Sequence, residues 1–543
     1  MTDLKARNQF LANLTKGDTF TQNGAVSNSS TGSRLTDQFA KAGTFRGREL
    51  NEVFADQSAL WGENPEMALR LPFYLRMITR KVKIKQETST ETVQRGQGNR
   101  DEALKRMLWI ALYHPNTFNE NMWLIPLVGS WRDLWKIMVL GYEAGLDKEK
   151  FFETLKAGLN EPSQKDLVLK YMPRIRSNSK CKSDWAIKTN NLAKEFSNYL
   201  GLSVKAYRKF KSTGLAHEFQ QLISEGLFKK IDFNKIPGKA LSMLASGDFL
   251  SKHKLVDKYT EWISKQPVAK FNGYVYELGR NLKLDLAKSY TLPLYKKLTY
   301  DKQFGNLIAV AKQDNGGLKG NVWCALDVSG SMTWPESKVA ENTYALDVCL
   351  SLGIFFSTLN TGAFHKNVVA FSESSKAVQL SGDFVDMYQQ VQRTGGYGST
   401  NFLSVIDEMV RVHKQNPSIP FSEFPETILV VSDMQFNPSG SRDTNYQKAL
   451  KKLREGGFPE KFVNNLKIIW WFCSGMKTND YPSTIDDAGT YVFSGFDGAV
   501  ISLLLGGDEV IDPVTNEVKK LSMEEMVIKA LSQELLLQLQ LRD

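Results

Sequence analysis

Histidine and cysteine are scarce in this chain, with five and four copies among 543 residues. The histidines are scattered along the sequence, so they do not suggest a zinc site. No two cysteines form a Cys-x-x-Cys pair, and the first buried-strand pattern contains one of them. This usage favours a reduced protein of the cell interior, which we expect to be cytoplasmic.

Long apolar runs are also missing. No run approaches the ~18–20 apolar residues that a helix needs to span a bilayer. The first residues lack the apolar core of a signal peptide. We therefore expect no membrane partner. A phosphate-binding Gly-x-x-x-x-Gly-Lys-Ser/Thr loop is absent as well, which argues against a nucleotide hydrolase of that type.

Positive charge, by contrast, is in excess. The formal net charge is +10 and the isoelectric point is near 9.1. Such a balance favours a polyanionic partner. A chain of 543 residues is too long for one hydrophobic core, so two or three domains are expected.

Composition and periodicity divide the chain into five parts. A stretch rich in Thr, Asn, Ser and Gly comes first, then a long helical pattern, then a junction containing Gly316 and Gly317, then alternating strands and helices. The sequence predicts an extended polar arm (1–34), a helical domain (35–300), a linker (301–319), an α/β domain (320–510) and a C-terminal helical segment (511–543).

The helical domain carries apolar residues at helical spacing, with breaks at prolines. Many moderate helices with short breaks indicate an α-solenoid of helical hairpins, although no fixed repeat period is visible. The predicted helices include Ala103–Tyr113, Met122–Leu140, Lys150–Leu159, Asn191–Tyr199 and Leu255–Ser264.

The α/β domain shows strands and helices in alternation, which gives a doubly wound parallel sheet. The predicted strands begin at Val322 and cover Asn367–Phe371, Thr427–Ser432 and Leu466–Cys473. The predicted helices are Ala345–Thr358, Phe402–Lys414, Tyr446–Glu455, Gly498–Leu505 and, at the end of the chain, Ser522–Gln540.

The first apolar strand ends in Asp327-Val328-Ser329-Gly330-Ser331. In an open α/β sheet, ligands sit outside the carboxyl ends of the strands. Carboxylate and hydroxyl oxygens are hard ligands that suit Mg²⁺ or Mn²⁺. The same residues also fit a Ser-Gly turn that caps the next helix, so this motif alone leaves both interpretations open.

Two later stretches add to this pattern: the glycine-rich loop Gly395–Thr400, and a strand that ends in Asp433. An Asp-x-Ser-x-Ser motif, a loop threonine and a strand-end aspartate, in this order, resemble the metal-ion-dependent adhesion site (MIDAS) of von Willebrand factor A domains. The resemblance implies one divalent cation, Mg²⁺ or Mn²⁺, surrounded by Asp327, Ser329, Ser331, Thr400 and Asp433.

By the same resemblance, the serine hydroxyls bind the cation directly and the aspartates act partly through water. One coordination position stays open for an acidic group of a protein partner. The chain departs from related Ro-type domains in one respect, because it has Asn401 where they often have Asp. This difference lowers the negative charge of the site.

Basic residues are concentrated in the helical domain. The segment Lys165–Lys182 holds six of them against one acidic residue, and Lys205–Lys211 holds four. A third cluster extends from Arg76 to Lys85. Each cluster alone fits a solvated face. Three clusters interleaved with the aromatic residues Tyr171, Trp185 and Tyr207 favour nucleic acid, because cations neutralise phosphates and aromatic rings stack on unpaired bases.

The helical half contains Tyr113-His114-Pro115, the stretch Leu124–Leu134 and Ile231–Pro237. These segments, with Tyr207-Arg208-Lys209, resemble a two-domain family of TROVE-like and von Willebrand A halves, the DUF2828 type, which is related to the Ro 60 kDa family. The resemblance implies a ring of HEAT-like hairpins that binds single-stranded RNA ends and structured small RNA, either non-coding or misfolded. The candidate RNA contacts are Arg174, Arg176, Lys180, Lys182, Lys205, Arg208, Lys209 and Lys211.

Two other functions remain open at this point. The chain could be a protein–protein adapter that acts through the A domain without RNA. It could also be a metal-dependent phosphodiesterase, which would need a second carboxylate cluster to hold another ion or activate water. The sequence shows no such cluster, and Ser329 and Ser331 have no histidine nearby in sequence to act as a base. We therefore expect a binding protein and not an enzyme.

Overall fold

The computed structural model describes residues 19–78, 80–83, 91–213, 218–289, 291–315, 318, 320–395, 398–439, 443–474, 480–496, 509–511 and 518–542. The chain divides into two compact units. We call them the sheet unit, Met1–Arg46 with Ile236–Ala530, and the helical unit, Gly47–Lys235 with Leu531–Asp543.

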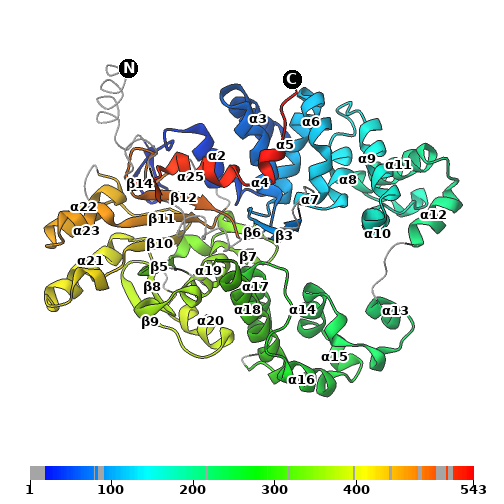
Figure 1. Ribbon diagram of the computed structural model, residues 1–543. Coiled ribbons are helices and arrows are strands. Elements are labelled where there is room, and N and C mark those ends of the chain that lie inside the picture. The colour runs from blue at the N-terminus through cyan, green and yellow to red at the C-terminus, as the bar shows by residue number, and fades with distance from the viewer. Residues whose placement is uncertain are drawn as a thin grey trace. The chain divides into compact units, whose positions relative to one another are not determined.

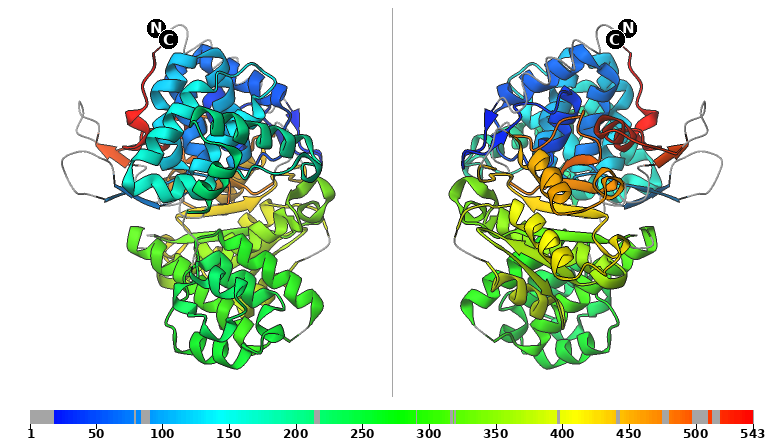
Figure 2. Two further views of the ribbon diagram at one scale, coloured as in Figure 1. Left: turned by 90° about the vertical axis from the view of Figure 1, so that its right-hand side faces the viewer. Right: turned by 90° about the vertical axis from the view of Figure 1, so that its left-hand side faces the viewer.

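A six-stranded sheet forms the centre of the sheet unit (Figure 1). Its strands are β5 (Val322–Asp327), β8 (Asn367–Phe371), β9 (Ser375–Gln379), β10 (Thr427–Ser432), β11 (Lys467–Phe472) and β12 (Thr490–Ser494). Their order is β12-β11-β10-β5-β8-β9, and Figure 2 shows them side by side, coloured from green to orange. All neighbours are parallel except β9, which pairs antiparallel with β8. The sheet is therefore mixed.

The two central strands explain the apolar runs of the sequence. Every residue of β5 and β10 is buried, because helices cover both faces of the sheet. On one face, α19 (Ala345–Leu359) lies so close that a Cβ on Gly353 would be 2.3 Å from the Leu326 side chain. On the other, α21 (Leu403–Gln415) and α22 (Asn445–Glu455) pack on Ile428 and Trp470. The predicted alternation of strands and helices is confirmed.

The described part of the predicted arm is anchored to the sheet unit. A short hairpin of β1 (Thr19–Phe20) and β2 (Val26–Ser27) leads into α2 (Arg34–Ala42). The Ser33 hydroxyl accepts a hydrogen bond from the Thr36 N–H at 3.3 Å and so caps α2. Phe39 of α2 packs edge-to-face on Phe493 of β12, with ring centroids 5.4 Å apart. The polar composition predicted an extended arm, whereas the described residues of this stretch form a hairpin and the N-terminal cap of α2.

Five helices that lie between Ile236 and Asn315, which the sequence assigned to the helical domain and the linker, belong to the sheet unit instead. Gly279 of α17 approaches α19 so closely that a Cβ would lie 2.1 Å from the Ser351 hydroxyl. The rings of Phe304 and Phe384 stack at 4.5 Å. The five helices are α14 (Gly238–Ser246), α15 (Phe249–Lys252), α16 (Val256–Lys265), α17 (Val275–Lys288) and α18 (Leu294–Asn315).

The residues predicted as a linker, 301–319, are helical as far as Asn315. Phe304, Ile308 and Ala311 follow helical spacing and are buried, so this stretch packs as part of the core and does not form a flexible connection. Smaller elements complete the sheet unit: β6 (Lys338–Ala340), β7 (Thr343–Tyr344), α20 (Phe384–Gln392), α23 (Glu460–Asn465), β13 (Glu509–Ile511), β14 (Val518–Lys520) and α25 (Met523–Leu531). The predicted helix Gly498–Leu505 lies outside the described residues.

The helical unit is built from moderate helices, as the sequence predicted. Several breaks at prolines are helix starts, because proline has no N–H to satisfy in the first turn; α4, α6 and α10 all begin this way. The elements are α3 (Leu50–Glu63), α4 (Pro65–Arg76), β3 (Arg80–Lys83), β4 (Glu91–Gln94), α5 (Arg100–Tyr113), α6 (Pro115–Asn121), α7 (Ile125–Val128), α8 (Trp131–Leu140), α9 (Glu149–Asn160), α10 (Pro162–Tyr171), α11 (Asp184–Tyr199), α12 (Val204–Ser212) and α13 (Glu218–Ser224).

The end of the chain returns to the helical unit. The Gln533 side chain accepts from the Arg95 N–H at 2.7 Å and donates to its carbonyl at 2.8 Å. The Gln540 N–H donates to Asn121 Oδ1 at 2.9 Å. The single final helix predicted for Ser522–Gln540 is wrong beyond Leu531, because the helix ends there and the chain continues only with a short 3₁₀ turn over Leu536–Gln538.

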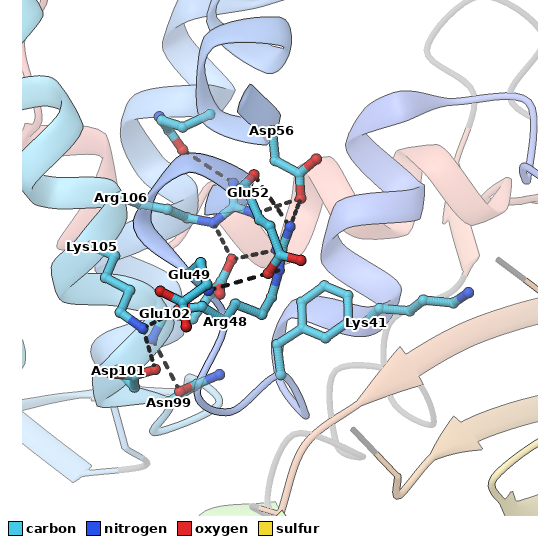
Figure 3. A network of polar contacts seen from close by, with 12 residues as sticks. Lys41, Arg48, Glu49, Glu52, Asp56, Asn99, Asp101, Glu102, Lys105 and Arg106 are labelled. Carbon is cyan, nitrogen blue, oxygen red and sulfur yellow. Dashed lines mark hydrogen bonds and ion pairs between the residues drawn. The ribbon is translucent and has the colours of Figure 1, made fainter. Parts of the chain in front are cut away.

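A buried network of charges holds α3 and α5 together in the helical unit (Figure 3). Glu102 is 1% exposed and accepts hydrogen bonds from two guanidinium groups, Arg48 at 3.0 Å and Arg106 at 2.9 Å. Arg48 also donates to Asp56 at 2.7 Å, and Arg106 to Gln57 at 3.1 Å. The carboxylate of Glu102 thus compensates two buried cations at once.

Replacement of Glu102 by Ala should destabilise the protein by about 3–5 kcal/mol, because two buried guanidinium groups lose their shared carboxylate. Urea denaturation of the full chain measures this loss. Glu120→Ala is the matched control, since Glu120 pairs with Arg542 on the surface and should contribute at most about 1 kcal/mol. Equal urea midpoints for Glu102→Ala and wild type would contradict the prediction.

Candidate functional site

The Asp-x-Ser-x-Ser motif lies where β5 ends. Asp327 is the last residue of the strand, and Ser329 and Ser331 lie at a 3₁₀ turn over Gly330–Thr333. The Ser329 N–H donates to Asp327 Oδ1 at 3.0 Å, and the two serine hydroxyls are 3.2 Å apart. The turn thus brings one carboxylate and two hydroxyls together.

The other two predicted residues join this cluster. Thr400 ends the glycine-rich loop, and its hydroxyl donates to Ser329 Oγ at 2.9 Å. Asp433 directly follows β10, the strand paired with β5. Each of the five side chains is at most 4% exposed. The structure therefore places all five predicted residues in one buried group of oxygen atoms.

Two buried carboxylates in this cluster are electrostatically unfavourable. Burial and, after it, the charge of Asp433 raise the pKa of Asp327 to about 7, although hydrogen bonds from Ser329 and Ser432 lower it. Burial also raises the pKa of Asp433. The Oδ2 atom of Asp433 is buried without a hydrogen-bond partner. A cation or a proton would relieve this arrangement.

The donor set fits a small hard cation. Neighbouring ligands of an octahedral Mg²⁺, with bonds of about 2.1 Å, lie about 3.0 Å apart. The Thr400–Ser329 and Ser329–Ser331 oxygen distances of 2.9 and 3.2 Å match this spacing. Only two of the five donors are carboxylates, and the described residues contain no group of three or more His, Cys, Asp or Glu suited to a metal ion. The site would therefore depend on hydroxyl ligands.

Two residues that support the cluster, Ser432 and Asn437, were not predicted from the sequence. The Ser432 hydroxyl donates to Asp327 Oδ2 at 2.5 Å, and Asn437 Oδ1 accepts from the Thr400 N–H at 3.1 Å. Met434, with φ at 64°, adopts a left-handed conformation that only a few per cent of non-glycine residues share. Ser432 directly precedes Asp433 at the end of β10, and this position next to a predicted ligand could have identified it. Asn437 has no recognisable sequence signal.

Asn401, which follows Thr400, has a structural role in its loop. Its N–H donates to the Ser372 carbonyl at 2.7 Å, and its side-chain amide donates to the Glu373 carbonyl at 3.1 Å. A carboxylate could not donate this second hydrogen bond. The asparagine at this position is thus explained by the hydrogen bonds of its loop.

The metal-free protein should be more stable at pH 5 than at pH 8. The folded-state pKa of Asp327 is about 7 against an ordinary value of 3.8, so the folded protein binds more protons between these values. The free energy of unfolding therefore falls as pH rises through this range, and the loss is complete above about pH 7. Mn²⁺ at pH 8 should restore it. Thermal melting at both pH values measures the effect, and Asp327→Asn should show a smaller difference. Equal differences in both proteins would contradict the assignment.

The basic segments of the helical unit meet at a second site. Tyr207 of α12 donates from its hydroxyl to the Pro173 carbonyl at 3.1 Å, and Arg208 Nε donates to the Ile175 carbonyl at 3.1 Å. Lys211 Nζ donates to the Leu169 carbonyl at 2.8 Å. These bonds fix α12 against the chain that follows α10. Together they bring cations from two separate sequence clusters to one place.

A pocket of about 250 Å³ opens at this junction. It is lined by Arg174, Ile175, Tyr207, Arg208, Lys211 and Ser212. Burial lowers the pKa of Lys211, and the positive charge of Arg174 lowers it further. No ion pair joins Arg174, Arg208 or Lys211 to a carboxylate within the described ranges. The pocket, which we call the basic pocket, therefore has uncompensated positive charge.

The other predicted RNA contacts lie outside this pocket. Arg176, Lys180, Lys182, Lys205 and Lys209 are exposed. One expectation about aromatic residues is wrong. Tyr207 is fully buried and cannot stack on a base, because its ring belongs to the core under α12. Trp185, by contrast, is 44% exposed and available for stacking. In the third cluster, Lys85 lies outside the described residues.

Two family models match this chain, and both are described as domains of unknown function. DUF2828 matches residues 21–198, and DUF7788 matches residues 322–535. The DUF2828 match confirms the predicted resemblance to that family over residues 21–198. Among curated proteins, the Uncharacterized protein L728 of Acanthamoeba polyphaga mimivirus is 22% identical, over 92% of this chain and 86% of its own length.

Among solved structures, the crystal structure of the Deinococcus radiodurans RO (RSR) protein aligns with 87% of this chain and 98% of that chain. The sequence identity is 14% and the TM-score is 0.39. A score below 0.5 does not establish a shared fold. No helix among the described residues is long and apolar enough to cross a bilayer.

Proposed function

We propose that this chain is an RNA-binding protein that contacts single-stranded or end-frayed RNA through its helical unit. The basic pocket carries this proposal, because Arg174, Arg208 and Lys211 converge there without a carboxylate partner among the described residues. On a surface of mixed charge, these cations would have acidic neighbours. The segments 172–183 and 200–213, however, contain no Asp or Glu at all.

The contrast with nearby cations on the same unit supports this interpretation. Lys188 bonds to Asp184 and Glu143 at 2.9 Å, and Lys148 bonds to Glu195 at 2.7 Å. Their charges are compensated within the protein. The cations of the basic pocket are not, so an external polyanion would compensate them. The exposed Trp185 lies in the same stretch of chain and would favour unpaired bases over a duplex.

We propose in addition that Asp327, Ser329, Ser331, Thr400 and Asp433 hold Mg²⁺ or Mn²⁺. The buried, unpartnered Oδ2 of Asp433 is the observation that favours this. The ion would supply a Lewis-acidic position for an acidic group of a protein partner. In this proposal the sheet unit is of the von Willebrand A type, and the helical hairpins are HEAT-like. The closed ring implied by the family resemblance stays a prediction.

The metal site also supports a second candidate function, a protein–protein adapter that acts through the sheet unit without RNA. Copurification separates the two. An ultraviolet absorbance ratio typical of nucleic acid favours RNA binding, whereas a ratio typical of protein alone favours the adapter. Catalysis is not part of the proposal, because a phosphodiesterase would need a second carboxylate cluster to hold another ion or activate water.

Salt dependence tests the RNA proposal directly. Single-stranded RNA should bind with an affinity that falls steeply as salt increases, because each neutralised phosphate releases counterions. Three cations in the basic pocket predict a log–log slope of about −2 or steeper, at roughly −0.7 per contact. Filter binding between low and moderate salt measures this slope. A slope near zero would contradict binding through phosphate contacts.

A further inference from the structure

The turn Thr21–Ala25 in the sheet unit is a compact structure of its own. The Thr21 N–H donates to the Ala25 carbonyl at 2.9 Å, and the Gly24 N–H donates to the Thr21 carbonyl at 2.9 Å. Gly24 has φ at +86°, a conformation that favours glycine. The Thr21 hydroxyl donates to the Phe436 carbonyl at 2.6 Å, and both Thr21 and Ala25 are buried. The turn is therefore fixed to the chain that follows β10.

Asn23, at the tip of this turn, reaches the candidate metal centre. Its Nδ2 atom donates to the Gln435 carbonyl and, at 3.4 Å, to the Thr400 hydroxyl. The carbonyl can only accept, so the amide nitrogen and not the amide oxygen must face this side. Asn23 thus links a distant part of the sequence to a proposed cation ligand.

This contact sets the orientation of the Thr400 hydroxyl. That hydroxyl has one proton, which it donates to Ser329 Oγ at 2.9 Å, and two lone pairs. Asn23 occupies one lone pair, so the other is left for a cation. Without Asn23, the hydroxyl would lose a constraint on its rotation.

A second contact runs from the turn to Asp433. The Gln22 N–H donates to Gln435 Oε1 at 2.7 Å. The Gln435 N–H in turn donates to Asp433 Oδ1 at 3.1 Å, on the carboxylate whose other oxygen is unpartnered. The turn therefore contacts Thr400 directly and Asp433 through Gln435. These are two of the five proposed ligands.

We infer that the Thr21–Ala25 turn is part of the candidate metal centre, with Asn23 as a positioning residue for Thr400, and that docking of the turn and cation binding strengthen each other. This inference rests on the proposed metal site. Coupling between two binding events is reciprocal, so a bound cation stabilises the turn by the same factor by which the docked turn improves cation affinity.

Asn23→Ala in the full chain tests the positioning role. Loss of one partly buried hydrogen-bonding group should weaken Mn²⁺ binding by about 5–10-fold, as measured by calorimetry. Gln22→Ala is the matched control, because Gln22 uses its backbone N–H while its side chain is exposed. Its Mn²⁺ affinity should stay within about twofold of wild type, since that N–H is retained.

Hydrogen exchange supplies a readout that a merely structural role would not change. In wild type, Mn²⁺ should slow exchange of the Gly24 and Ala25 amides, which are hydrogen-bonded within the turn. Asp327→Ala should remove this effect of Mn²⁺. Suppose that wild type binds Mn²⁺. If Asn23→Ala then binds it equally well, or if exchange in the turn does not respond to Mn²⁺, the inference is overturned while the metal site stands. If wild type binds no Mn²⁺, both are overturned.

Discussion

Asp327→Ala should abolish Mn²⁺ binding to the full chain. Asp327 is one of only two carboxylates among the five oxygen donors, and neutral hydroxyls cannot replace its charge. Changes to residues that merely support a metal ligand typically cost 10–100-fold in affinity, so removal of this carboxylate should exceed about a hundredfold. Isothermal titration calorimetry with Mn²⁺ at pH 8 measures the effect, because Asp327 is ionised there.

The control for this experiment removes a different carboxylate from the same unit. Asp301 lies on α18, is partly buried and accepts one long hydrogen bond from the Phe384 N–H at 3.4 Å. Asp301→Ala changes the net charge by the same amount and should leave Mn²⁺ affinity within about twofold, because it contributes no proposed ligand. Equal Mn²⁺ affinity in wild type and Asp327→Ala would reject the metal assignment.

The structure also separates the Asp327 effect from general unfolding. Asp327→Ala removes an acceptor for the Ser329 N–H and the Ser432 hydroxyl, so some destabilisation is expected. Asp327→Asn keeps the size of the side chain and removes only its charge. Both variants should lose Mn²⁺ binding, and at pH 8 the Asn variant should melt no lower than metal-free wild type, because it lacks the buried charge of Asp327.

The sheet and the oxygen cluster were predictable for a local reason. Strands such as Thr427–Ser432 are apolar on both faces because helices cover both, and this pattern is visible in a single sequence. Parallel strands place their carboxyl ends at one edge, so Asp327 and Asp433 had to lie near each other once β5 and β10 were neighbours.

Other features depend on contacts between residues far apart in sequence. The helices before the sheet join the sheet unit through contacts such as that of Gly279 with Ser351, which no local pattern reveals. The polar composition of the first residues predicted an extended arm, yet Asn23 and Thr21 bond to the chain after β10. Tyr207 was predicted to stack on a base because it lies among basic residues. Its side chain is buried in the core under α12.

The largest effect on RNA binding should come from reversing four charges together. We expect Arg174→Glu, Arg176→Glu, Arg208→Glu and Lys209→Glu in one chain to weaken binding by at least about a hundredfold at moderate salt. Hydrogen bonds to charged groups contribute about 1.5–3 kcal/mol each, so even two lost phosphate contacts would produce this change. The log–log salt slope should also become shallower by roughly 2.8 if all four residues contact phosphates.

Lys211 is left unchanged in this design because its ammonium group bonds to the Leu169 and Lys170 carbonyls and so holds α12 in place. Among the four reversed residues, only Arg208 uses its side chain in a hydrogen bond among the described residues, to the Ile175 carbonyl. A second variant without the Arg208 change therefore separates lost folding from lost binding. It should still show a large loss of RNA affinity with an unchanged melting temperature.

A charge-matched control reverses four exposed lysines on the sheet unit: Lys252, Lys312, Lys414 and Lys451. It changes the net charge of the chain by the same amount. If RNA binding depends on the basic segments of the helical unit, this control should stay within several-fold of wild type, because none of the four lysines belongs to that unit. Asp327→Ala should likewise leave RNA affinity nearly unchanged, since the two sites are assigned to different units. If the four-residue reversal in the helical unit binds RNA as tightly as wild type, its basic segments are ordinary solvated surface.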